Sequence, residues 1–156
     1  MNLIETLKGI HPGIILEREL AKRKLAKGPF ALSIQEYPQI LGAITKGKRK
    51  MNTPLALRIE KALGIEEGFF MTLQVFYEIK EEKKKQEMLI TPDIKIFNPA
   101  LFWDTAIDKI NWIQMKRAVI ERVMERGNLA EKKEIIRFYG KEEVRRIIDN
   151  NKAVTT

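Results

Sequence analysis

Apolar residues recur at helical spacing along the first part of the chain, and prolines stand where several of these stripes begin. The stripes predict helices over residues 12–24, 27–34 and 36–45. Pro12 occupies a first helical position, where its missing N–H costs nothing, and Pro38 lies in the first turn of the third helix. Short helices that begin at prolines predict a compact helical bundle.

Two further helices complete this bundle. The stretch NTPLALRIEKALG predicts a helix with Thr53 as its N-cap and Gly64 as its C-terminal stop. Residues 66–86 predict a longer helix whose aromatic face fades into a charged, solvated run. The aromatics of that face are predicted core residues, or else part of a dimer or partner surface; they are Phe69, Phe70, Phe76 and Tyr77.

The second half of the sequence changes character. A charged run, a short apolar patch and two prolines predict a linker with little regular structure over residues 87–99. Apolar stripes then predict a helix that contains Trp112 and ends at Gly127, one over residues 130–139, and a last one around residues 144–148. Leu101, Phe102 and Trp103 are expected to pack against these three helices. The predicted fold is all-α: a five-helix domain over residues 1–86, the linker, and a small helical domain over residues 100–150.

Charge is concentrated in the first half. The chain has a formal net charge of +8, and residues 22–50 carry eight Lys or Arg against one acid, Glu36. A basic surface of this kind favours a polyanionic partner. The chain has no cysteine, no apolar run of membrane-spanning length and no secretion signal, so a cytoplasmic protein without membrane association or disulfides is expected.

The helices over residues 27–34 and 36–45 are short and close together, which predicts a helix-turn-helix. Ala31 is the small residue that such a unit needs where its helices cross, while Leu41 and Ile44 anchor the second helix. The side chains left outside are slim, and a slim helix fits the major groove of DNA, about 12 Å wide. For the basic stretch that follows, a partner-protein surface and an ordinary solvated turn are the alternatives.

The first half resembles the HigA-type antitoxins, which are XRE-like, lambda-repressor-like helix-turn-helix regulators of toxin–antitoxin and plasmid-maintenance operons. The matching positions span residues 8–80 in order: His11–Gly13, Gly47–Arg49, Ala56–Leu57, Ala62–Gly64 and Leu73–Gln74. The resemblance implies a protein that binds its own promoter and also binds and neutralises a toxin. Two positions depart from the family pattern, since Gln35 replaces the customary turn glycine and Glu36 an apolar residue.

The predicted DNA contacts follow from this arrangement. Gln39 is the candidate base reader, because a carboxamide pairs with adenine N6 and N7, while Pro38 and Ala43 are placed to meet thymine methyls. The predicted recognition helix contains no Lys or Arg, so guanine readout is not expected from it. The remaining predicted contacts are Tyr37 at the helix entry and phosphate-binding cations, namely Lys27, Lys46, Lys48, Arg49 and Lys50.

The second half resembles a small helical family of short bacterial proteins that are often encoded beside nucleotidyltransferase-type toxins. The residues that carry this resemblance are Phe102–Asp104, Asp108–Trp112, Val119–Gly127 and Tyr139–Gly140. By analogy, this half is expected to bind a toxin protein.

Motifs of catalysis are missing from the sequence. His11 is the only histidine, and helix-entry packing or capping is its expected role. Asp104 is expected to cap the helix after it and Asp108 to be exposed, although the pair is spaced to share a metal. The sequence thus predicts a non-enzymatic, homodimeric DNA-binding regulator without cofactors; the alternative is a toxin-binding module that does not read DNA sequence.

Overall fold

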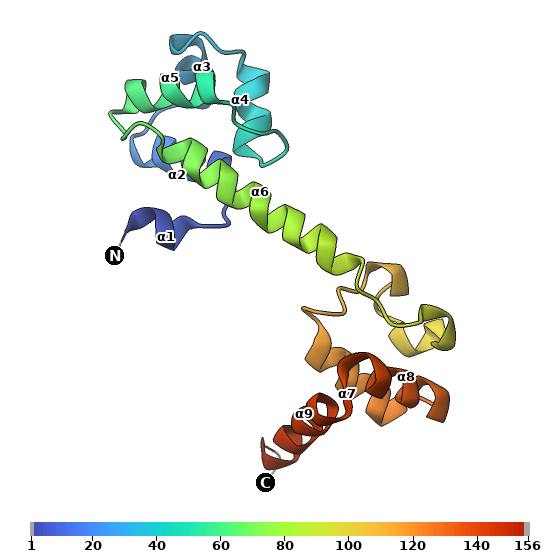
Figure 1. Cartoon of the computed structure of the whole chain (residues 1–156). Helices are drawn as coiled ribbons and strands as arrows, with labels where there is room; N and C mark the ends of the chain where they lie inside the picture. The colour runs from blue at the N-terminus through green and yellow to red at the C-terminus, as the bar shows by residue number, and fades with distance from the viewer. Residues whose placement is uncertain (1, 155–156) are drawn as a thin grey trace. The chain divides into compact units, whose positions relative to one another are not determined.

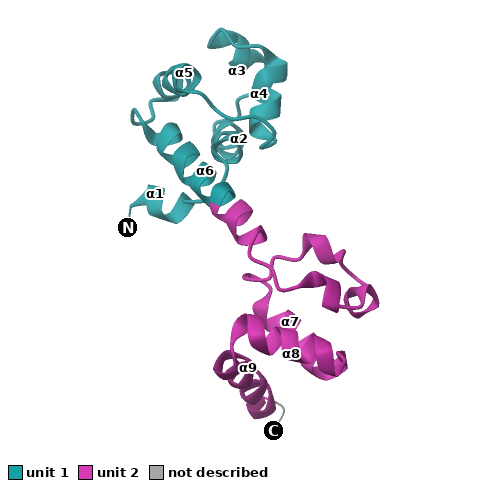
Figure 2. Ribbon diagram, turned by 45° about the vertical axis from the view of Figure 1, so that its right-hand side comes forward, with its two compact units in different colours: residues 1–82 teal, residues 83–156 magenta. Residues whose placement is uncertain are grey.

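The computed structural model describes residues 2–154, and its described residues form helices and loops without a β-strand. The chain divides into two compact units, residues 1–82 and residues 83–156 (Figure 2). Within the described residues, no helix combines the length and the apolar character that crossing a membrane requires. The all-α prediction is confirmed.

The first unit contains six helices along the described chain (Figure 1). They are α1 (Leu3–Leu7), α2 (Pro12–Lys22), α3 (Lys27–Ser33), α4 (Pro38–Thr45), α5 (Thr53–Leu63) and α6 (Phe69–Met88), the last of which extends past residue 82. Helix α1 lies outside the five predicted helices. Helix α3 begins at Lys27, the first residue of the range predicted for it.

The core of the first unit contains the residues that the apolar stripes predicted. Leu16 and Leu20 of α2, Leu41 and Ile44 of α4, and Phe70 of α6 are at most 1% exposed. Helix α2 approaches α4 closely at Gly13, where an added Cβ would lie 1.7 Å from the carbonyl oxygen of Ile44. Only glycine permits this approach, which fixes α4 on the domain.

Two details of the first unit differ from prediction. Asn52, not Thr53, caps α5, because the Asn52 side chain accepts the N–H of Leu55 at 2.9 Å. The aromatic face of α6 is only partly core, since Phe70 is fully buried whereas Phe69, Phe76 and Tyr77 are half-buried. The predicted stop at Gly64 is confirmed by its left-handed backbone, with φ of 65°.

The second unit is built on three helices and the turns before them. The short 3₁₀ turns η1 (Ile94–Ile96), η2 (Pro99–Phe102) and η3 (Ile107–Lys109) precede α7 (Lys116–Arg126), α8 (Leu129–Tyr139) and α9 (Lys141–Val154). Trp112 is 1% exposed and packs against the rings of Phe97, Phe102 and Phe138. Its backbone carbonyl also accepts the hydroxyl of Tyr139 at 2.6 Å. An aromatic cluster therefore forms the centre of this unit.

The predicted linker over residues 87–99 is wrong in its extent, because α6 continues to Met88 and the whole segment belongs to the second unit. Phe97 is buried in the aromatic cluster. Two glutamates of α8 hold the backbone of the segment: Glu134 accepts the N–H of Asp93 at 2.9 Å, and Glu131 accepts the N–H of Asn98 at 2.8 Å.

Three other predictions for this half are corrected. Helix α7 begins only at Lys116, and Trp112 lies in the preceding turn, where Asn111 accepts two backbone N–H groups. Trp103 does not pack against the helices, since it is 76% exposed. Asp104 does not cap a helix, because its carboxylate binds both terminal nitrogens of Arg122.

Candidate nucleic-acid interface

Helices α3 and α4 pack against each other and are joined by the short turn of residues 34–37. Gln35 in this turn has φ of 59°, in the left-handed region that favours glycine. Arg58 of α5 holds the turn: one terminal nitrogen donates to the carbonyls of Ile34 and Gln35, at 3.0 and 3.1 Å. The other lies 3.3 Å from a carboxylate oxygen of Glu36. Both departures from the family pattern thus lie in a turn that Arg58 stabilises.

The outer face of α4 is small and uncharged. Pro38 and Gln39 are exposed at its first turn, preceded by Tyr37, which is 72% exposed. Gly42 and Ala43 are half-buried, and the space where Gly42 would carry a Cβ is open. The structure therefore brings together the predicted base-contacting residues at the entry and along one side of α4.

The loop after α4 is held at its middle by His11. The imidazole is 4% exposed and caps α2, because Nδ1 accepts the N–H of Gly13 at 2.9 Å. A further hydrogen bond joins the ring to the backbone of Arg49, and the ring meets Tyr77 edge to face. Gly47, with φ of 74°, passes directly beside the imidazole. The expected capping role of His11 is confirmed, and the same ring fixes the basic loop.

The far end of the loop is held by Gln74 of α6. Its side chain is 2% exposed, and its amide oxygen accepts the N–H of Met51 at 3.0 Å. Met51 itself is buried in the core. Two buried polar side chains, His11 before α2 and Gln74 on α6, therefore set the path of residues 46–51.

The five predicted phosphate-binding cations fall into two groups. Lys46, Lys48 and Arg49 are exposed, and their side chains form no ion pair with any described residue. Lys50 instead lies 2.6 Å from the carboxylate of Glu78, and Lys27 lies 2.8 Å from that of Glu17. These two cations are partly neutralised, so only the first three offer an uncompensated charge.

The electrostatics of His11 follow from its burial. Desolvation lowers the pKa of this histidine, although the hydrogen bond to Arg49 opposes the shift. The neutral imidazole is also the form that the geometry requires, because a protonated Nδ1 has no lone pair for the N–H of Gly13. The loop is therefore attached to a neutral ring at physiological pH.

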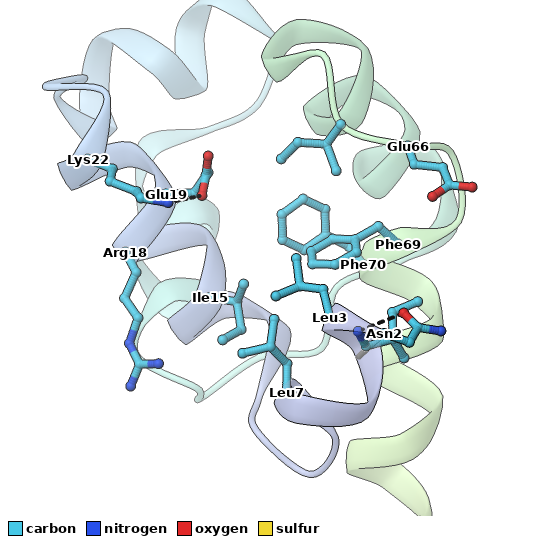
Figure 3. Close-up of a pocket in the computed structure, with 12 residues that line it drawn as sticks. Asn2, Leu3, Leu7, Ile15, Arg18, Glu19, Lys22, Glu66, Phe69 and Phe70 are labelled. Atoms are coloured by element: carbon cyan, nitrogen blue, oxygen red, sulfur yellow. Dashed lines mark hydrogen bonds and ion pairs between the residues drawn. The ribbon is translucent and has the colours of Figure 1, made fainter.

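A separate pocket of about 580 Å³ lies between α1, α2 and the start of α6 (Figure 3). Leu3, Leu7, Ile15 and Phe69 supply apolar walls, while Arg18 and other charged residues stand toward the edge. This pocket contains none of the predicted DNA-contacting residues.

Groups suited to metal binding do not come together among the described residues, where no cluster of three or more His, Asp or Glu side chains occurs. The Asp104 carboxylate is occupied by Arg122, whose hydrogen bond is the main cause of the lowered pKa of Asp104. Asp108 is exposed, as expected.

Sequence reasoning missed Arg58 as the residue that holds the α3–α4 turn and Gln74 as the anchor of the basic loop. Arg58 is 22 residues from Glu36, and no periodicity links the two positions. For Gln74 a signal existed, because Leu73–Gln74 is one of the matches to the HigA pattern. The match marked the position without indicating what the amide does.

The comparisons with known proteins are informative for one segment only. A search of curated proteins found no match, and a search of solved structures found none either. Residues 97–148, which lie within the second unit, match the model of a family of unknown function, DUF6922.

Proposed function

We propose that the chain is a sequence-specific DNA-binding regulator of the HigA type, in which α3 and α4 act as a helix-turn-helix. In this proposal α2–α6 form a lambda-repressor-like domain, and α4 enters the major groove. The observation that supports it best is the slim outer face of α4, followed at once by three unpaired cations on a loop that His11 and Gln74 hold in place. A preorganised loop contacts phosphates without first being ordered.

The division of labour follows from the side chains. Gln39 reads adenine, while Pro38 and Ala43 make apolar contacts with thymine methyls. Lys46, Lys48 and Arg49 bind phosphates and set the position of the helix on the duplex. Lys50 and Lys27 contribute less, because each already has a carboxylate partner.

The wider role proposed here is that of a cytoplasmic antitoxin. A homodimer covers two half-sites of its own promoter, spaced by about 34–36 Å, and so represses the operon. The second unit binds and neutralises the toxin protein. No step of this role requires a cofactor.

The test of DNA binding is fluorescence anisotropy of the purified protein on its own upstream DNA and on scrambled DNA of equal length. Affinity for the upstream DNA is expected to exceed that for the scrambled DNA by a factor of at least about 10³. Both affinities should fall as salt rises, with a slope of about −0.9 per phosphate contacted. Equal affinities for the two DNAs would reject sequence-specific binding.

A rival function is a protein-interaction module that has kept the helix-turn-helix fold without reading DNA sequence. The observation that favours it is the absence of a cation on α4, together with the ion pairs of Lys27 and Lys50. An inverted repeat upstream of the gene favours the regulator. A neighbouring toxin gene without such a repeat favours the interaction module.

A further inference from the structure

Trp103 is an unusual surface residue of the second unit. Its indole is 76% exposed, while the adjacent Phe102 is 3% exposed and belongs to the aromatic core. Trp103 therefore contributes little to the core. Its exposed indole instead leaves a large apolar area in contact with water. Exposed tryptophan is also among the side chains that contribute most to protein–protein binding.

A pocket of about 390 Å³ lies next to this indole, with an opening to solvent. Its lining includes Leu101 and Trp103 from the segment before α7, Arg126 at the end of α7, and Asn128 in the α7–α8 turn. Leu129, the residue after Asn128, is 70% exposed. The surface thus combines apolar area with polar donors.

Two charged residues line this pocket, and they differ in exposure. Arg126 is exposed and forms no ion pair with any residue in the described part of the chain. Glu131 also lines the pocket, but it is 3% exposed. One Glu131 oxygen accepts the N–H of Asn98, and the other accepts that of Asn128, at 2.8 and 2.7 Å. The Arg126 guanidinium and the Trp103 indole are therefore both accessible to a ligand in this pocket.

The walls of the pocket are fixed to one another. The bonds of Glu131 join the segment that leads to Trp103 with the start of α8. Gly127 makes the α7–α8 turn tight, since an added Cβ would lie 2.5 Å from the carbonyl oxygen of Val123. A pocket held in this way loses little conformational entropy on binding.

We propose that this pocket is the docking site for a protein segment that carries a carboxylate next to a large apolar side chain. The carboxylate pairs with Arg126, and the apolar side chain packs on Trp103 and Leu101. Charge complementarity favours an acidic segment, because Arg126 is the exposed charge of the pocket, whereas the Glu131 carboxylate is buried and accepts two backbone N–H groups. The inference rests on the part of the proposed function that gives the second unit a protein partner, and it is independent of DNA binding.

The test is selection of peptides from a random twelve-residue phage library on immobilised full-length protein. Enriched peptides are expected to place Asp or Glu within two positions of Leu, Ile, Phe or Trp. Peptides that lack an acid, or no enrichment over a Trp103→Ala surface, would overturn the proposal.

Affinities of the best peptide are then compared by fluorescence polarisation. Trp103→Ala and Arg126→Gln should each weaken binding at least tenfold, whereas Arg145→Gln, which removes an exposed cation of α9 outside the pocket, should not. Equal losses for Arg126→Gln and Arg145→Gln would reduce the contact to general charge attraction and reject the pocket.

The same three variants are measured on the upstream DNA. Unchanged DNA affinity with lost peptide binding supports a docking site separate from DNA recognition. Wild-type protein that binds DNA but selects no acidic–apolar peptide rejects this inference and leaves the proposed DNA function standing. Selection of acidic–apolar peptides by a protein that does not bind DNA supports this inference and rejects the proposed DNA function.

Discussion

Gln39 and Lys48 are both exposed, yet their removal should affect DNA binding differently. Gln39→Ala is expected to weaken specific binding by about 1–3 kcal/mol and to leave binding of random DNA almost unchanged. Lys48→Ala should weaken both alike and lower the salt slope by about 1. Anisotropy titrations on both DNAs measure these changes. A similar loss on both DNAs for Gln39→Ala would remove it as a base reader.

His11 should make the first unit sensitive to mild acid. Its pKa is lowered in the folded protein, mainly by burial, so the unfolded chain takes up a proton first as pH falls below about 6.5. The contribution of His11 to the free energy of unfolding is therefore fully present above that pH and decreases below it, by about 1 kcal/mol if the α2 cap is lost. Urea unfolding followed by helical circular dichroism at pH 7.5 and 5.5 measures the change.

His11→Asn is the matched control, since asparagine keeps a capping oxygen that does not titrate. Its loss of stability between the two pH values should be smaller than that of the wild type. If both proteins lose the same amount, another group is responsible.

At the level of single residues, core positions were predictable from the sequence, whereas contacts between different elements were not. Apolar spacing was enough to place Leu41 and Ile44 in the core, and proximity to Pro12 was enough to give His11 a capping role. Asn52 and Thr53 are equally good caps by residue type, and only the hydrogen bond to Leu55 separates them. The ion pairs of Lys50 and Lys27 join different elements, so local patterns did not reveal them.

The packing of α2 on α4 can be tested with two glycines. Gly13→Ala would drive a methyl group into the Ile44 carbonyl and should cost about 1–3 kcal/mol or more, because the helices must separate. Gly42→Ala is the control within α4: its added methyl meets open space and should raise stability by up to about 1 kcal/mol. Urea unfolding measures both, and a neutral Gly13→Ala would disprove the close approach.

Helices were predictable from sequence where an apolar stripe lies between clear start and stop residues, as for α5 and α8. The segment before α7 was not, because its short 3₁₀ turns carry no helical period. Phe97 is buried by Phe102 and Trp112 and not by residues of its own turn. Trp103 faces solvent beside a buried Phe102, and spacing alone cannot distinguish two adjacent aromatics.

The second unit should lose stability in strong acid, because two of its carboxylates have lowered pKa values. Hydrogen bonds from Arg137 lower the pKa of Glu134 to about 2, and those from Arg146 and Lys116 do the same for Glu143. These carboxylates stabilise the folded unit above about pH 4.5, and that stabilisation is lost as pH falls toward 2.

Both tryptophans belong to the second unit, so their fluorescence follows its unfolding alone. The urea midpoint seen by fluorescence should fall steadily from pH 5 to pH 2.5. Glu134→Gln should show a shallower fall over the same range. An equal fall in both proteins would assign the acid sensitivity to other groups.

For the molecule as a whole, the sequence predicted two helical parts and the surface that α4 presents. The division between the parts could not be located from composition, because α6 runs as one helix from apolar to charged residues past residue 82.

The anchoring of the basic loop by His11 and Gln74 also determines how a protease meets this protein. Residues 46–50 include four trypsin sites on an exposed loop, which normally makes a segment easy to cut. A protease must first pull several residues away from the protein, and here the backbone of Arg49 and that of Met51 are bonded to buried side chains. The native loop should therefore resist trypsin. Gln74→Leu should open it to rapid cleavage, and bound operator DNA should protect it again.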